Sequence, residues 1–273
     1  MSRLHVRPHP PAADGTVLSV TPESAGWSHV GFRVAKLSDG QRHDGGEAGR
    51  ETCLVLVAGS ADIVAGEHRF DGVGGRASPF DDRAPGAVYV PAGVTWSVLA
   101  RGDAELAVCT APGSGGRAPR LIGDAEMPRE IRGSGTNTRH VRNILPETEP
   151  ADGLLVVEVI TPAGHWSSYP PHKHDTATPG EETVLEETYY HRTRPRQGFA
   201  FQRVYSADRT LDEAIAVEDG DVVMVPRGYH PVGAAHGYDL YYLNVMAGPE
   251  RRWLFRTDPD HAWIIAPPPS PGS

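Results

Sequence analysis

The sequence predicts an all-β protein built from two similar β-barrels in tandem. The 273-residue chain contains 31 glycines and 25 prolines, and the segments between them are short and rich in valine, tyrosine, leucine and threonine. Segments of this length, bounded by turn residues, are typical of strands, and no long amphipathic helix stands out. Strands that follow one another at such spacing indicate a sandwich or a barrel.

The two halves of the chain share a pattern. The stretch "GRASPFDDRAPGAVYVPAGVTWSVLA" of the first half resembles "DEAIAVEDGDVVMVPRGYHPVGA" of the second. Each contains a β-branched strand that ends in Val-Pro, then a glycine turn (Pro91–Gly93 and Pro226–Gly228), and then a strand that turns back. We interpret this as two copies of one barrel, an N-terminal domain at 1–125 and a C-terminal domain at 126–273. The Pro/Ser-rich tail "APPPSPGS" is expected to be frayed.

The expected strands can be placed in chain order. They lie within residues 52–66, 86–100, 104–112, 153–164, 187–192, 198–206, 213–232 and 238–248. Cys53 and Cys109 fall in apolar strands of the first half, so we expect two buried free thiols rather than a disulfide or a metal pair.

Charge and hydropathy restrict the partners and the location of the protein. The formal net charge is −9, and lysine and arginine form no cluster along the chain. Nucleic acid and anionic membranes are therefore disfavoured as partners. The N-terminus lacks the apolar run of a secretory signal, and no segment is long enough to span a bilayer. We expect a cytoplasmic protein, and the sequence is compatible with a homo-oligomer.

A pair of histidines in "YPPHKHD" is the first candidate for a metal site. Pro170 and Pro171 favour an extended backbone, so alternation places His172 and His174 on one face and Lys173 on the other. Alone, two such histidines would be at least as well explained by a solvated surface pair. A metal requires further ligands from neighbouring strands.

The following strands supply further candidate ligands. In "EETYYHR", alternation places Glu187, Tyr189 and His191 on one face, and in "VPRGYHPVG" His230 follows a Pro-Gly turn. His172, His174, Glu187 and His230 form a donor set that suits a divalent zinc, manganese or iron ion. Several other glutamates lie near Glu187, and we favour Glu187 because it fixes the phase of the strand; the others are Glu181, Glu182 and Glu186.

The order H-x-H, glutamate, "GD-V-VP-G--H" resembles the pattern of the cupin superfamily, and the duplicated halves look like a bicupin of two jelly-roll-like barrels. The segments "SSYPPHKHD", "EETYYHR", "GFAFQRVYS", "VPRGYHPVG" and "YYLNVMAGPERRW" resemble one isomerase family. This family contains 5-deoxy-glucuronate isomerase and 4-deoxy-L-threo-5-hexosulose-uronate ketol-isomerase. The first half has only His43 and Glu51, with Val94 and Thr95 in place of a histidine. We expect its metal site to be lost and its role to be packing and subunit contacts.

The resemblance implies the conversion of 5-deoxy-D-glucuronate to 5-dehydro-2-deoxy-D-gluconate in inositol breakdown, with a sugar acid as the small-molecule substrate. Such an aldose–ketose conversion needs a group that carries a proton between neighbouring carbons, and a divalent metal would stabilise the negative charge that develops. Our candidates for the proton carrier are Tyr189, His191, Glu182 and Tyr242. The candidates that would hold the substrate carboxylate are Lys173, Arg192 and Arg203.

Three alternative functions stay open at the level of the sequence. The chain could isomerise another uronate-type sugar acid, since the metal ligands do not define the substrate. An iron cupin that activates oxygen could use the same ligands, and it would require oxygen. A non-catalytic cupin that binds a sugar acid would retain affinity without forming product.

Overall fold

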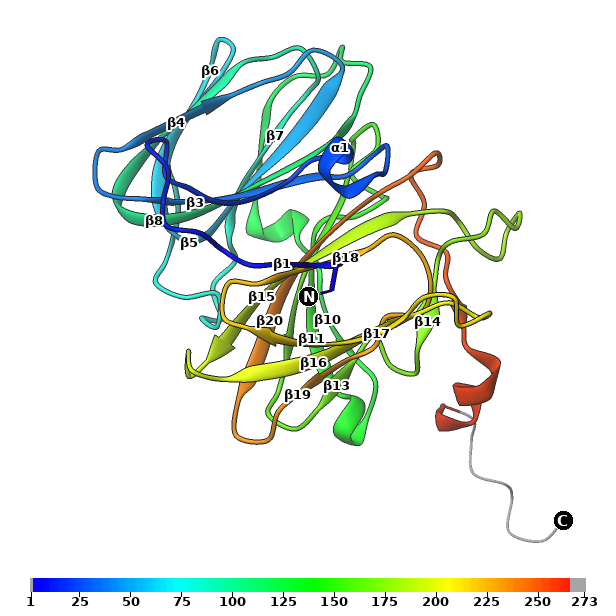
Figure 1. Cartoon of the computed structure of the whole chain (residues 1–273). Helices are drawn as coiled ribbons and strands as arrows, with labels where there is room; N and C mark the ends of the chain where they lie inside the picture. Colours follow the sequence, from blue (N-terminus) through cyan, green and yellow to red (C-terminus); the bar gives the residue numbers. More distant parts are fainter. Residues whose placement is uncertain (1, 266–273) are drawn as a thin grey trace, which may run out of the picture.

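The computed structural model describes residues 2–265, so the proline-rich tail of the sequence lies outside the described residues. The chain forms two β-barrels, one above the other in Figure 1, with few helical residues. The helical segments are α1 (Pro22–Ala25) and the 3-10 helices η1 (Asp124–Glu126), η2 (Gly135–Asn137) and η3 (Pro259–Ile264). None of the helices in residues 2–265 has the length and apolar character that a bilayer crossing demands. The all-β prediction is confirmed.

The first barrel is formed by a single eight-stranded sheet. Its strand order is β2 (Thr16–Val20), β3 (Gly31–Leu37), β8 (Trp96–Pro112), β5 (Arg50–Ala65), β7 (Gly86–Val90) and β9 (Arg120–Ile122). In addition, β4 (Arg42–Gly45) pairs with β8, and β6 (His68–Arg76) pairs with β5. The long strands β5 and β8 bend at irregularities in their shared register near Leu56 and Ser60. Because bulges bend a strand, both ends of β5 can face the same apolar core.

The second barrel consists of two facing sheets. The larger has the order β1 (His5–Val6), β18 (Val222–Val225), β15 (Glu186–Arg194), β20 (Asp239–Ala247), β12 (Leu155–Thr161), β11 (Arg139–Leu145) and β10 (Arg129–Arg132). The smaller has the order β13 (Trp166–Ser167), β19 (Val232–Ala234), β16 (Phe199–Tyr205) and β17 (Asp212–Glu218). A separate pair, β14 (His172–Lys173) and β21 (Arg256–Thr257), lies apart from these sheets. An apolar core that draws residues from both sheets fills the barrel.

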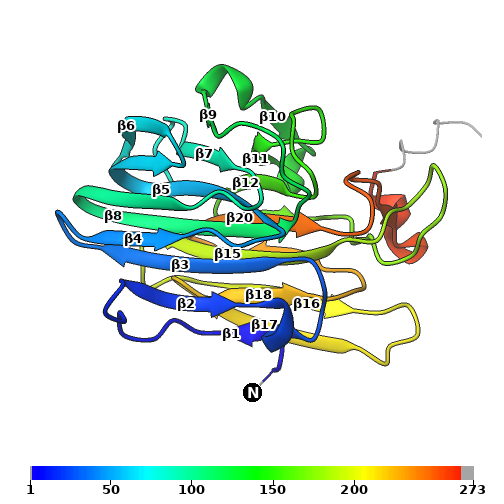
Figure 2. The same ribbon diagram turned by 90° about the horizontal axis from the view of Figure 1, so that it is seen from above.

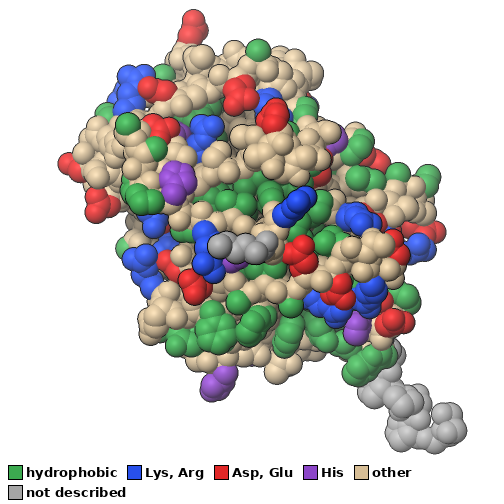
Figure 3. Space-filling model, viewed as in Figure 1, with side chains coloured by type: hydrophobic (Ala, Val, Ile, Leu, Met, Phe, Trp, Pro, Cys, Tyr) green, Lys and Arg blue, Asp and Glu red, His purple; other side chains and the backbone are tan. Residues whose placement is uncertain are grey.

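Alternation along the strands decides which side chains face the interior of the second barrel. On β15, Tyr189 belongs to the interior core, whereas Tyr190 belongs to the core shared with the first barrel. On β16, Gln202 is buried inside, whereas Phe199 and Phe201 are exposed. Figure 3 shows hydrophobic side chains gathered on the lower part of the molecule, where the second barrel lies. The predicted phase of the "EETYYHR" strand is therefore the observed one.

The two barrels pack through a shared apolar core and two buried thiols. Cys53 and Cys109 lie opposite each other on β5 and β8, and both are buried and free, as predicted. The core includes residues of β3, β5, β7 and β8 from the first barrel and of β15, β18 and β20 from the second. The barrels are thus joined by a continuous interior rather than by a flexible linker.

The strand registers show how the two repeats correspond. Val90 and Val225 occupy the same place in the repeated Val-Pro motif; Val90 pairs with Thr52, and Val225 pairs with Glu187. Thr52 is therefore the counterpart of Glu187. Glu51, which we had placed at the position of the metal ligand, corresponds instead to Glu186. That assignment was wrong by one residue, and a shift of one residue turns a side chain to the other face of the sheet.

Glu51 and Glu186 dock the two barrels reciprocally. The carboxylate of Glu186 accepts hydrogen bonds from the backbone N–H groups of residues 28–30 of the first barrel, at 2.7–2.9 Å. The carboxylate of Glu51 accepts from the N–H groups of residues 152–154, which lead into the second barrel, at 2.6–2.7 Å. The two loops precede β3 and β12, which hold equivalent places in the repeats. Each barrel therefore contributes a carboxylate to the same kind of contact.

Replacement of Glu51 by glutamine is expected to lower the free energy of unfolding by about 2 kcal/mol, because hydrogen bonds to a buried charged group are lost or weakened. The midpoint of urea denaturation measures this change. The same substitution at Glu67, which is exposed in the turn between β5 and β6, provides the control and should leave the midpoint unchanged. Equal midpoints for the two variants would contradict the docking role of Glu51.

The first strand of each repeat belongs to the other barrel. Strand β9 precedes the second repeat but pairs with β7 of the first barrel, and β1 precedes the first repeat but pairs with β18 of the second. Figures 1 and 2 both show β1 beside β18. Because β7 and β18 are equivalent, β1 and β9 occupy equivalent edges. The predicted division at residue 125 therefore leaves β1 with the wrong barrel.

Candidate metal centre

Three of the four predicted metal ligands lie together inside the second barrel. Candidate ligand atoms of His174, Glu187 and His230 are all within 4.8 Å of one another, and the three residues are buried. The Nε2 atoms of His174 and His230 lie 3.0 Å and 3.2 Å from the same oxygen, Oε2 of Glu187. Two imidazoles and a carboxylate thus point to a common position.

The surroundings fix the orientation of both imidazole rings. Nδ1 of His174 lies 3.0 Å from the carbonyl oxygen of Leu185, and Nδ1 of His230 lies 2.9 Å from that of Gly228. An Nδ1–H that donates to a carbonyl leaves the lone pair on Nε2, which is the usual arrangement around a metal. Nε2 of His230 is buried and lacks a hydrogen bond of acceptable geometry in the described part of the chain. The donor set therefore fits a divalent metal.

His172 lies at the edge of this cluster. Its ring centroid is 4.9 Å from that of His230 and 6.3 Å from that of His174, and its ring also packs against Phe255 at 4.5 Å. It does not belong to the compact group of three. His172 lies on β14 and lines a cavity of about 680 Å³, which gives it contact with both the cluster and the cavity. It stays a predicted fourth ligand.

The protonation of the three histidines depends on burial and on their neighbours. Burial lowers the pKa of His230 to about 4, and burial together with the neighbouring His230 and His174 lowers the pKa of His172. Burial also opposes a charge on His174, but its hydrogen bond to Glu187 prevails and raises its pKa. His172 and His230 are therefore neutral at pH 7, as metal ligands must be.

The other glutamates near Glu187 have separate roles. Glu181 pairs with Arg256 near the surface, and Glu186 docks the first barrel, as described above. Oε1 of Glu182 accepts hydrogen bonds from Lys173 and from the backbone N–H groups of residues 175 and 176, at 2.8–3.0 Å. Only Glu187 among these glutamates joins the histidines.

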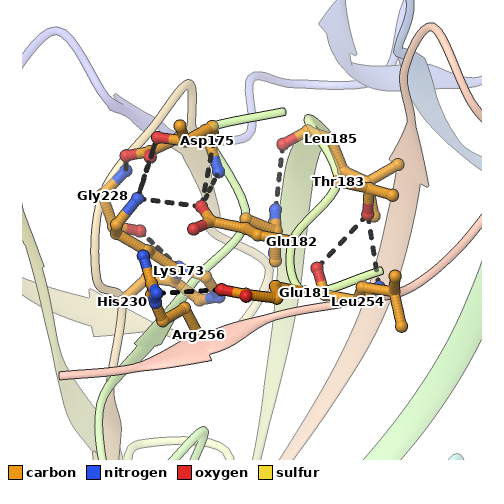
Figure 4. A network of polar contacts seen from close by, with 12 residues as sticks. Lys173, Asp175, Glu181, Glu182, Thr183, Leu185, Gly228, His230, Leu254 and Arg256 are labelled. Atoms are coloured by element: carbon orange, nitrogen blue, oxygen red, sulfur yellow. Dashed lines mark hydrogen bonds and ion pairs between the residues drawn. The ribbon is translucent and has the colours of Figure 1, made fainter. Parts of the chain in front are cut away.

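Lys173 and Glu182, which we predicted to bind substrate and to carry the proton, belong to one structural network. Lys173 donates to Asp175 and Glu182, and Asp175 accepts from the backbone N–H of Gly228 at 2.8 Å. Figure 4 shows this network beside His230. Gly228 in turn accepts from His230, so the network holds the turn that carries this histidine. We therefore no longer assign binding of the substrate carboxylate to Lys173 or proton transfer to Glu182.

The two predicted arginines are also engaged elsewhere. Arg192 faces the first barrel, where it pairs with Glu105, and it also pairs with Asp219 of the second barrel. Arg203 lies on the exposed face of β16 and forms two hydrogen bonds to Asp212, at 2.7 and 2.8 Å. Alternation had already placed Arg192 opposite to Glu187, so strand phase could have excluded it. Neither arginine is retained as a carboxylate ligand.

Arg139 is the cationic residue that the sequence analysis missed. It lines the cavity beside His172, donates to the carbonyl oxygens of Asn137 and Tyr169 at 3.1 and 3.3 Å, and forms no ion pair within residues 2–265. Burial lowers the pKa of its guanidinium, and the opposing effect of the nearby Glu130 carboxylate does not offset this. Its position at the start of β11, far from the histidine motifs in sequence, gave no signal of this proximity.

The remaining predicted proton carriers lie in the interior of the barrel next to the cluster. The ring centroids of Tyr189 and Tyr242 are 4.9 Å apart, and that of Tyr189 is 5.7 Å from His230. The Tyr189 hydroxyl bonds to Ser168 at 2.9 Å, and the Tyr242 hydroxyl bonds to Ser167. Burial raises the pKa of both tyrosines, so each hydroxyl keeps its proton at neutral pH.

His191 lies one step farther along β15, where its Nε2 bonds to Gln202 at 3.0 Å. Burial lowers its pKa to about 4, below the value of 6.5 that applies to the unfolded chain. The unfolded chain therefore takes up a proton first as the pH falls, and the free energy of unfolding decreases between pH 6.5 and 4.

In the His191→Gln variant this contribution is absent, so the pH dependence should be shallower by up to about 1.4 kcal/mol per pH unit. Urea denaturation at pH 7, 6, 5 and 4.5 measures the free energy of unfolding of the variant and of the wild type. A chelator is present throughout, so that release of metal does not contribute to the pH dependence. Parallel curves for the variant and the wild type would refute a neutral, buried His191.

Comparison with known proteins gives the family of the chain. The sequence profile of the KduI/IolB family matches residues 4–264. A protein of Geobacillus thermodenitrificans named 5-deoxy-glucuronate isomerase is 52% identical over 265 residues, which cover 97% of this chain and 97% of that protein. A protein of Halalkalibacterium halodurans with the same name is 47% identical over 250 residues, which cover 91% and 93% of the two chains.

Solved structures agree with the sequence comparison. The crystal structure of an IolB-like protein from Salmonella typhimurium has a TM-score of 0.93 and 51% identity, and the match covers 96% of this chain and 99% of that one. Oxalate decarboxylase OxdC of Bacillus subtilis, at 14% identity, has a TM-score of 0.64 over 94% of this chain and 80% of its own, which shows a likeness of fold. The bicupin prediction is confirmed, and the chain belongs to the KduI/IolB family.

Proposed function

We propose that the chain is a metal-dependent isomerase that converts 5-deoxy-D-glucuronate to 5-dehydro-2-deoxy-D-gluconate in the cytoplasmic breakdown of inositol. The observation that carries this proposal is the buried cluster of His174, Glu187 and His230. It occurs in a chain that matches proteins named 5-deoxy-glucuronate isomerase at about half of its positions over nearly its whole length. His172, at the edge of the cluster, is proposed as the fourth ligand.

The reaction moves a proton between two neighbouring carbons, with no net oxidation. A zinc, manganese or iron ion held by the cluster would stabilise the negative charge that develops on the substrate oxygens. The burial of His174, Glu187 and His230 keeps water away from this position, and a low local dielectric strengthens such electrostatic stabilisation.

Arg139 is our candidate for the group that holds the substrate carboxylate. A guanidinium that already has two carbonyl acceptors is fixed in orientation, yet its charge lacks a counterion within residues 2–265. The cavity that it shares with His172 has a volume of about 680 Å³, which is ample for a six-carbon sugar acid. A substrate anchored at Arg139 would extend past His172 toward the cluster.

Tyr242 and Tyr189 are our candidates for proton donors to a substrate oxygen. Arg139 lies near enough to Tyr242 to lower its pKa in part, against the larger effect of burial. Tyr242→Phe removes the hydroxyl and little else, so kcat should fall by about 10²-fold while metal content is retained.

Tyr190→Phe is the matched control for Tyr242→Phe, because the Tyr190 hydroxyl donates to Glu105 of the first barrel and faces away from the cluster. Its turnover should match that of the wild type at temperatures at which the variant is folded. Equal turnover of Tyr242→Phe and Tyr190→Phe would remove Tyr242 from proton transfer.

The proposed function is tested by adding metal-loaded protein to 5-deoxy-glucuronate in D₂O without oxygen and following the aldehyde proton by NMR. We expect the aldehyde signal to disappear, the ketone product to form, and a chelator to abolish the reaction. A strict requirement for oxygen would favour an iron cupin oxygenase, and binding without turnover would favour a sugar-acid-binding protein. Either result would refute the proposal.

A further inference from the structure

The first barrel has a cavity at the place where the second barrel has its metal cluster. The registers make Thr52 the counterpart of Glu187, and Thr110, which pairs with Thr52, the counterpart of Met246. Both threonines line a cavity of about 150 Å³. Hydroxyl and guanidinium groups replace the metal ligands there. The residues whose side chains bring hydrogen-bond donors to the wall of this cavity include Ser19, Arg33, Arg50, Thr52, Trp96 and Thr110.

Two arginines bring positive charge to this cavity. Nη2 of Arg50 donates to the carbonyl oxygen of His29 at 2.6 Å and to Oγ1 of Thr110 at 3.0 Å, which fixes the guanidinium. Its carboxylate neighbour, Glu47, lies 3.8 Å away, and the Glu47 side chain is 63% exposed. Arg33 is half-buried and has no hydrogen-bonded or ionic partner for its side chain within residues 2–265. Both arginines are thus less exposed than Glu23 and Glu47, the acidic residues in the wall of the cavity.

A buried indole N–H provides an independent sign of a missing acceptor. Trp96 is 5% exposed, and its Nε1 is buried without a hydrogen-bond partner in the described part of the chain. Gly45 leaves room for the ring, because a Cβ on Gly45 would lie 2.3 Å from Trp96 Cζ2. A buried donor without an acceptor costs about 1–3 kcal/mol, so the indole N–H would gain from an acceptor in the cavity that Trp96 lines.

We propose that the mouth of the N-terminal barrel binds one small hydroxylated carboxylate. The carboxylate would accept from Arg33, Arg50 and Trp96, and its hydroxyl groups would bond to Thr52, Thr110 and Ser19. A single negative charge is favoured because Glu23 and Glu47 at the cavity already offset part of the positive charge. A volume of about 150 Å³ suits an acid of roughly three or four carbons, since a cavity of similar size takes up benzene.

The test is a calorimetric titration of the full-length protein with glycerate, with inorganic phosphate as a comparison. We expect one glycerate per chain in the wild type and also in Glu187→Gln, in which the C-terminal site is impaired. Arg33→Gln and Arg50→Gln should each weaken binding at least about 10-fold. Arg42→Gln is the matched control, since Arg42 lies on β4 of the same barrel and pairs with Asp44 at the surface, and it should bind as the wild type does.

NMR identifies the site directly. Glycerate should shift the indole Nε1–H resonance of Trp96, which is the signal that disappears in Trp96→Phe. Arg33→Gln keeps the test valid if Arg50→Gln fails to fold, because the Arg33 side chain forms no hydrogen bond or ion pair within residues 2–265 that the substitution would remove. The absence of binding, binding that persists in Arg33→Gln but disappears in Glu187→Gln, or tighter binding of phosphate than of glycerate would each overturn the proposal.

Discussion

Glu187→Gln is expected to reduce turnover by about 10³-fold, because the loss of several kcal/mol of charge stabilisation corresponds to that factor. Glutamine keeps the size of the side chain but removes the negative charge that both imidazoles approach, at 3.0 and 3.2 Å. Metal affinity should fall by more than the roughly 100-fold that changes around a metal site cause. Elemental analysis after dialysis, together with the NMR assay, measures both effects.

Glu181→Gln is the matched control for this experiment. Glu181 precedes the same strand and makes an exposed ion pair with Arg256, away from the histidines. It should retain the metal content and the turnover of the wild type. If Glu187→Gln also kept its metal and its rate, the cluster could not be the catalytic centre.

Arg139→Gln is expected to reduce kcat/KM by roughly 10²- to 10³-fold, with most of the loss in KM, because a buried charge-assisted contact to the substrate carboxylate is worth about 2–5 kcal/mol. Arg139→Lys should recover only part of this loss, since an ammonium group cannot form the paired hydrogen bonds of a guanidinium. Initial rates over a range of substrate concentrations separate KM from kcat.

Arg203→Gln controls for the removal of one positive charge from the second barrel. Arg203 is exposed and already forms two hydrogen bonds to Asp212, so its substitution should leave kcat/KM unchanged. Metal content should be unchanged in both arginine variants. An Arg139→Gln enzyme with the KM of the wild type would show that another group holds the carboxylate.

The sequence was sufficient for those parts of the site that depend on strand phase. Glu187 could be chosen among four neighbouring glutamates because alternation tied it to Tyr189 and His191, and the structure has this phase. His230 could be placed because it follows a Pro-Gly turn that recurs in the first half. Period-two alternation is a local property, so it can be read from a few residues.

Contacts between residues that are far apart in the chain could not be predicted from the sequence. Arg139 comes close to His172 only because β11 and the segment that holds Tyr169 meet at the mouth of the barrel, where Arg139 donates to the Tyr169 carbonyl. Likewise, nothing local distinguishes Arg192 as a residue that pairs with Glu105, which is 87 positions away. Strand phase could have excluded Arg192 from the interior of the barrel, but a charged side chain carries no sign in the sequence of the partner that it pairs with.

The exchange of leading strands between the barrels bears on the origin of the chain. If each half is pictured as a separate polypeptide, β1 and β9 become arms that each copy lends to its neighbour, and Glu51 and Glu186 become the same contact made twice about a two-fold axis. The present chain is what fusion of two genes for such an arm-swapped homodimer would produce. In such a fused chain, one barrel could keep the proposed metal site while the mouth of the other diverged.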